Sequence, residues 1–160
     1  SRLVTDPGQL RNIIIIAGVI GDPHVVDWLL QWMSQDQYAR VAGETFSMIT
    51  GIDLEQQKMT RDAPVDFSTL PDEDADDENV KTHDDENLPW PDASVITSYW
   101  NSIKGNYIAG KRYLLGKPIE INTLKNDLNC AYQRQRHAIA LEIALLEKDQ
   151  VLLNTHSKAS

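Results

Sequence analysis

The chain has 160 residues, of which 41% are hydrophobic, and a formal net charge of −9. This length suits one domain with its own core, and the acidic balance disfavours a protein that binds nucleic-acid phosphates. The single cysteine, Cys130, excludes an intrachain disulfide framework and favours a reducing compartment, so we expect a cytoplasmic protein without a membrane span.

The first predicted elements are three short helices within residues 8–51. Apolar side chains recur at intervals of three and four residues, as on one face of a helix: Leu10, Ile13, Ile14, Ala17 and Ile20. Gly21 suits the left-handed position that ends a helix, while Asp22 suits the N-cap and Pro23 the first turn of the next helix. A strand followed by a phosphate-binding glycine loop is the alternative, but no third glycine opens the second helix.

The third predicted helix begins at Asp36 and ends before Gly51. Asp36 is a suitable N-cap, and Arg40 lies four residues further on, so the two side chains can pair across one turn. Ala42 and Gly43 are small enough to let a second helix approach closely. No strand is expected between residues 8 and 51.

Residues 53–92 hold 14 acids and 3 bases, a balance of −11. Such a segment buries too little apolar surface to offset its ordering entropy, so we predict a long mobile loop. Asp72, Asp74 and Asp76 alternate as in a calcium-binding loop. However, Asp77 stands where that loop needs glycine and His83 where it needs glutamate, so calcium binding is disfavoured.

Trp90 lies between two prolines near the end of this loop, in the stretch Leu88 to Asp92. Both prolines hold the residue before them in an extended conformation. Two interpretations stay open. Trp90 attaches the returning chain to the helical core, because tryptophan buries a large area, or it is an exposed anchor for a partner protein.

Helices and turns are predicted over residues 93–153. Gly110, Gly116 and Pro118 indicate short helix and turn around Lys111 and Arg112, which form a small basic cluster. The last helix, residues 133–148, is apolar on most sides and is therefore expected to pack between neighbours. Two arginines lie at its start, where positive charge opposes the helix dipole unless something compensates: Arg134 and Arg136.

Residues 18–51 resemble the HEAT-like helical repeat. The resemblance rests on the Gly21-Asp22-Pro23 turn, on Asp36 in the next turn, and on Arg40 ahead of small residues. Residues 123–149 resemble the repeat more weakly, with Arg134 or Arg136 in the arginine position, where such an arginine commonly pairs with an aspartate of a nearby turn. The stretches LPWPD, GKRYLLGKP and QRQR are also similar to an uncharacterised proteobacterial HEAT-repeat family. The resemblance implies an irregular stack of helical hairpins, an α-solenoid fragment.

We therefore predict one all-α domain over residues 1–160, the C-terminal part of a longer chain. Its expected function is that of a non-catalytic scaffold that binds a protein partner, since no motif for a catalytic triad, a metal or a phosphate loop is present. The alternative is a helical-repeat enzyme or nucleic-acid binder that uses the basic cluster 111–136. No cofactor is expected. The candidate partner-binding residues are Trp90, Lys111, Arg112, Arg134 and Arg136.

Overall fold

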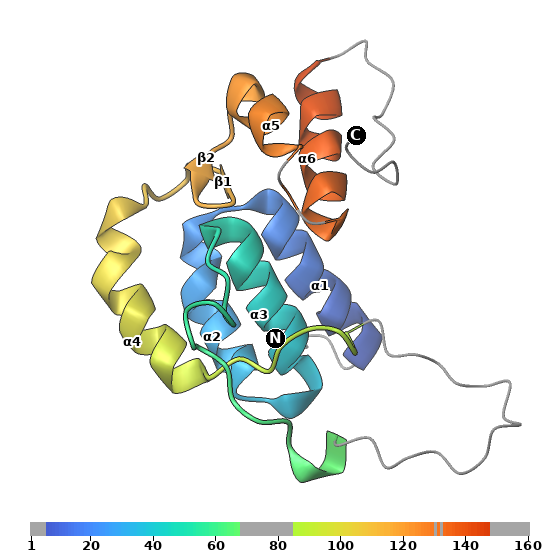
Figure 1. Ribbon diagram of the computed structural model, residues 1–160, viewed down its shortest axis with the longest axis vertical. Coiled ribbons are helices and arrows are strands. Elements are labelled where there is room, and N and C mark those ends of the chain that lie inside the picture. The colour runs from blue at the N-terminus through green and yellow to red at the C-terminus, as the bar shows by residue number, and fades with distance from the viewer. Residues whose placement is uncertain (1–5, 68–84, 130, 132, 148–160) are drawn as a thin grey trace, which may run out of the picture.

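The computed structural model describes residues 6–67, 85–129, 131 and 133–147 (Figure 1). The described chain is mostly helical, with one small two-stranded sheet. The helices are α1 (Pro7–Ile20), α2 (Val26–Met33), α3 (Asp36–Thr50), α4 (Ala93–Ile103), α5 (Ile121–Asp127) and α6 (Gln133–Leu146). The strands β1 (Tyr113–Leu114) and β2 (Lys117–Pro118) pair as an antiparallel hairpin. The predicted all-α class and the three helices within residues 8–51 are confirmed.

The corner between α1 and α2 forms as its three residues predict. Gly21 ends α1 with a φ of 71°, and its N–H donates to the Ala17 carbonyl at 3.0 Å. The carboxylate of Asp22 accepts from the His24 N–H at 3.0 Å, and Pro23 opens a short 3₁₀ turn, Pro23–Val25, that leads into α2. Each local preference therefore agrees with the fold at this corner.

The start of α3 differs from the prediction. Asp36 is the first helical residue, and Gln35 occupies the N-cap without a side-chain hydrogen bond. Asp36 accepts from Arg61 Nη2 at 2.6 Å instead of pairing with Arg40. The Arg40 guanidinium lies over the Trp90 ring, 4.7 Å from its centroid. Asp36 and Arg40 lie one turn apart, but each contacts a residue distant in sequence instead of the other.

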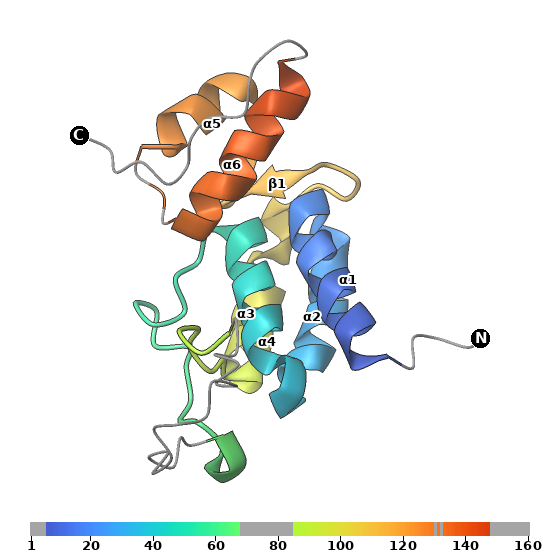
Figure 2. The ribbon, with the colours of Figure 1, turned by 90° about the vertical axis from the view of Figure 1, so that its right-hand side faces the viewer.

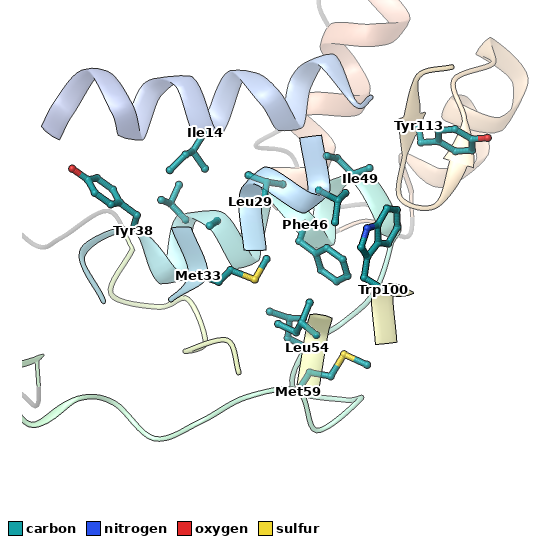
Figure 3. Packing of buried hydrophobic residues seen from close by; sticks show 14 residues of the cluster. Ile14, Leu29, Met33, Tyr38, Phe46, Ile49, Leu54, Met59, Trp100 and Tyr113 are labelled. Carbon is teal, nitrogen blue, oxygen red and sulfur yellow. The ribbon is translucent and has the colours of Figure 1, made fainter. Parts of the chain in front are cut away.

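A single hydrophobic core joins the first four helices. α3 packs against both α1 and α2, and α4 packs against α2, with α1 and α4 on opposite sides of the bundle (Figure 1). Figure 3 shows the side chains that meet at the centre of this core, among them Ile14, Leu29, Met33, Phe46, Ile49 and Trp100. Gly18 lets α1 approach α3 closely, because a Cβ there would lie 3.1 Å from Thr45 Cγ2.

α5 and α6 form a second, smaller cluster at the hairpin end of the bundle (Figures 1 and 2). Its buried members are Leu114, Leu124, Ile139 and Ile143. The prediction that the last helix packs between neighbours is wrong, because one side of α6 faces solvent with three exposed leucines: Leu141, Leu145 and Leu146. The expected helix over residues 133–148 ends at Leu146, and residues 148–153 lie outside the described chain.

Both ends of the predicted acidic loop 53–92 pack against the helices. Leu54 and Met59 are buried, and Thr60 forms an antiparallel bridge with Pro91. Pro91 and Leu54 also contact Gly43, so the close approach at Gly43 serves the returning chain and not a helix. Burial of apolar residues therefore orders the two ends of this segment, although its composition is acidic. The calcium candidates Asp72, Asp74 and Asp76 lie outside the described residues.

Asp92 caps the N-terminus of α4 and offers a test by mutation and acid. Hydrogen bonds from the Ser94 hydroxyl and the Val95 N–H lower the pKa of Asp92 below its ordinary value of 3.8. A carboxylate with a lowered pKa stabilises the fold above the ordinary pKa, and this contribution is lost as the pH falls through the lowered value. Asp92→Ala should lower the free energy of unfolding at pH 7 by about 1 kcal/mol.

Asp92→Asn is the matched control, because asparagine caps helices about as well but does not titrate. Chemical denaturation at pH 7 and in a series below pH 4 measures both variants. Asp92→Asn should retain most of the stability at pH 7 and lose part of the acid dependence. An unchanged acid dependence in Asp92→Asn would show that the carboxylate of Asp92 has no such role.

Candidate functional site

Residues 111–118 form a hairpin where the sequence predicts short helix and turn. Leu115 and Gly116 make the two-residue turn with φ values of 50° and 78°. Positive φ at both positions is the pattern of the tight hairpin turn whose twist matches the flanking strands. The prediction was wrong here because the hairpin depends on contacts with α1 and α3, which local sequence does not reveal.

The hairpin binds the C-terminal ends of α1 and α3. The Tyr113 N–H donates to the Gly21 carbonyl at 2.8 Å, while the N–H groups of Leu115 and Gly116 donate to the carbonyls of Met48 and Ile49 at 2.7 and 2.9 Å. Carbonyl groups in the last turn of a helix have no partner within that helix, so the hairpin satisfies them. Since α1 and α3 both end on this hairpin, they run in the same direction.

Arg112 is part of this junction and is therefore structural. Its guanidinium donates to the carbonyls of Ile20 and Val19 at 2.8 and 2.9 Å, and it forms an ion pair with Glu142 of α6. The Glu142 side chain is only 3% exposed. A buried carboxylate needs a charged partner, so Arg112 links α1, the hairpin and α6 instead of offering a free cation to a partner protein.

The remaining bases of the predicted cluster 111–136 are dispersed. Lys117 pairs with Asp127 at 2.8 Å and Lys125 pairs with Glu147, while Lys111 is exposed. Arg136 is half-buried, and its Nε has no hydrogen-bond partner among the described residues. Arg134 belongs to α6, but its side chain lies outside the described part. Ion pairing neutralises three of these bases, counting Arg112, which weakens the case for a phosphate-binding surface.

Trp90 is buried, with 9% of its surface exposed. The guanidinium groups of Arg40 and Arg61 lie 4.7 and 5.3 Å from its ring centroid, and Phe67 meets the ring edge-on at 5.2 Å. These contacts attach the returning chain to α3, as the first interpretation of Trp90 holds. The side chain does not offer the exposed anchor that the second interpretation requires.

Among the described helices, α1 exposes the most large aliphatic side chains, and the sequence-based prediction missed this surface. Five aliphatic residues there are 36–53% exposed, and we call them the outer arc: Ile13, Ile15, Ile16, Val19 and Ile20. The sequence places Ile13 and Ile20 on the buried face, but both are exposed. A usable signal was present. Four consecutive isoleucines span about 300° around a helix, so they cannot all face one core.

The outer arc carries no charge. Arg11 is the one ionisable residue of α1. It lies one turn before Ile15, at the edge of the arc, and its guanidinium binds the buried Asp85 at 2.6 Å. The only polar residues interleaved with the arc are Gln9 and Asn12, both exposed. A contiguous apolar face of this kind on a folded protein marks a contact surface more often than chance exposure.

A groove of about 680 Å³ lies beside the C-terminal half of α3, between the segments 51–56 and 87–89 and the start of α6. Glu44, Asp53 and Glu55 are the ionisable residues among its described lining. Within the described chain, no three histidine, cysteine or acidic residues are placed to hold a metal ion. Similarly, no described helix is both long enough and apolar enough to cross a membrane.

Comparison of the chain with models of protein families, with curated proteins and with solved structures gave no match. The fold and this surface define a mostly helical chain in which α1 carries five exposed aliphatic side chains and α6 three.

Proposed function

We propose that this chain is a non-catalytic protein-interaction domain and that the outer arc of α1 is its contact surface. The observation that carries the proposal is the exposure of five aliphatic side chains on one 14-residue helix. Covering this arc removes apolar surface from water, at roughly 25 cal/mol per Å². A helix or a helical hairpin of a partner protein has the right shape to lie along it.

The arrangement of the helices supports a stacked, HEAT-like organisation as part of this proposal. α1 and α3 are parallel, and α2 connects the hairpin end of one to the opposite end of the other, so α2 runs antiparallel to both. Successive helical hairpins in a stack follow this order. A helix at the edge of such a stack keeps one side uncovered, as α1 does. The proposal includes the cytoplasmic location that the single cysteine favours.

A substitution in the outer arc tests the proposed function. Ile16 is 53% exposed, so Ile16→Lys should leave the fold intact but place a charge in the centre of the contact. We expect at least a tenfold loss of the proteins captured from a lysate of the host cell, since a loss of about 1.4 kcal/mol in binding already has this effect. Quantitative mass spectrometry of the captured proteins provides the measurement.

Ile108→Lys is the control, because Ile108 is 61% exposed and lies outside the helices. This variant makes the same chemical change outside α1 and should capture the same proteins as the unmodified chain. Equal capture by Ile16→Lys and the unmodified chain would show that the outer arc is not the contact surface.

A further inference from the structure

We propose that the outer arc of α1 binds the outer arc of a second copy of this chain. This inference rests on the proposed function, since it names the partner of the same surface. The outer arc can meet its own copy without charge repulsion inside the contact. In a twofold-symmetric dimer each patch meets its own copy, so charged residues in the patch would face like charges. The outer arc has none, whereas the chain as a whole carries a formal charge of −9.

The spacing of residues along α1 also suits self-association. Ile13, Ile16 and Ile20 are separated by three and four residues, the spacing of the contact positions in a pair of coiled helices. Gln9 continues the same stripe by one turn towards the N-terminus. Ile15 and Val19 widen the stripe on one side. Two such faces present matching aliphatic ridges to each other without any unpaired buried charge.

The size of the surface sets the expected strength. α1 has 14 residues and is about 21 Å long, so one face contributes a few hundred Å² per copy, well below the roughly 800 Å² of a standard interface. The dimer therefore belongs to the weak class, with a dissociation constant in the micromolar range or above. Salt should strengthen it, because screening reduces the repulsion between two acidic chains.

The lack of lysines and arginines beside the outer arc disfavours a membrane surface as its occupant. An anionic lipid surface repels a chain of charge −9 at close range, and α1 offers one basic residue, Arg11, which already pairs with Asp85. Membrane-surface helices typically place several lysines or arginines beside their apolar face. The described residues of α1 lack this feature.

Sedimentation velocity on the purified chain, from about 1 µM to about 500 µM, tests the inference. We expect a reversible monomer–dimer equilibrium whose dissociation constant falls as salt is raised. Ile16→Lys should raise that constant at least tenfold, and Ile13→Lys is a second variant in the same stripe. Ile108→Lys should change it by less than about twofold, as expected for a surface change outside the contact. Thermal unfolding confirms that each variant remains folded.

Three results would overturn the inference. The first is a chain that remains monomeric throughout the concentration range. The second is a dimer that survives both substitutions in α1, which would place the contact on another face. The third is a monomer that sediments with vesicles of phosphatidylcholine. If the chain is monomeric but Ile16→Lys still loses its captured proteins, the self-association is excluded while the proposed function stands.

Discussion

Gly21→Ala is expected to lower the free energy of unfolding by about 3–4 kcal/mol. Gly21 has a φ of 71°, which costs an alanine residue about 1–2 kcal/mol. In addition, a Cβ at this position would lie 2.3 Å from the Tyr113 carbonyl oxygen. That contact is backbone, so the hairpin would have to move away from the end of α1. Chemical denaturation monitored by circular dichroism measures the change.

Gly110→Ala is the matched control for this substitution. Gly110 has nearly the same φ, 75°, but a Cβ there would meet nothing within 4 Å. Gly110→Ala should therefore lower the free energy of unfolding only by the cost of the positive φ, about 1–2 kcal/mol. The difference between the two variants measures the close approach of the hairpin to α1. Equal losses would show that this approach does not contribute to stability.

Arg112→Ala is expected to lower the free energy of unfolding by about 2–4 kcal/mol, because it leaves the buried Glu142 carboxylate without its cation. The value lies towards the lower end of the range for buried pairs, since the Arg112 side chain is 44% exposed. It also removes two hydrogen bonds to carbonyls at the end of α1. Urea unfolding curves provide the measurement, with Lys111→Ala, an exposed neighbour, as a control that should change stability by less than about 0.5 kcal/mol.

A double substitution separates the ion pair from the other contacts of Arg112. Combining Arg112→Met with Glu142→Leu removes both charges together, so no carboxylate remains buried and unpaired. The double variant should be more stable than Arg112→Met alone. If it is equally unstable, the stabilising role of Arg112 lies entirely in its bonds to the α1 carbonyls.

Local sequence was sufficient for the first three helices. The Gly21-Asp22-Pro23 corner and Gly51 are signals whose physical cause lies within a few residues, namely a positive φ, a side-chain cap and a fixed proline φ. These elements form where predicted. Asp36 shows the limit of the same reasoning, because its partner Arg61 is 25 residues away.

The hairpin at 113–118 could not be predicted, because its strands are two residues long and its stability comes from the ends of α1 and α3. The role of Arg112 depends on the same long-range contacts. Composition was also misleading for residues 53–67, where Leu54 and Met59 are buried within an acidic segment.

The candidate site was predicted least well. The sequence predicts basic and aromatic residues as contacts, but the side chains of Arg112 and Trp90 are engaged by other residues of the fold. The outer arc of α1 belongs to the apolar run that begins with the four isoleucines 13–16, and such a run predicts burial. The hydrophobicity of a residue does not say which side of a helix the core covers, so an uncovered side becomes visible only once the neighbours are placed.

Site-specific photo-cross-linking in the host cell tests the central claim most directly. A photoreactive amino acid at position 16 would lie within the outer arc, and one at position 108 would lie outside the helices and outside the arc. We predict covalent adducts with protein from position 16 and few or none from position 108. Adducts from position 108 alone, or from neither position, would contradict the assignment of α1 as the contact surface.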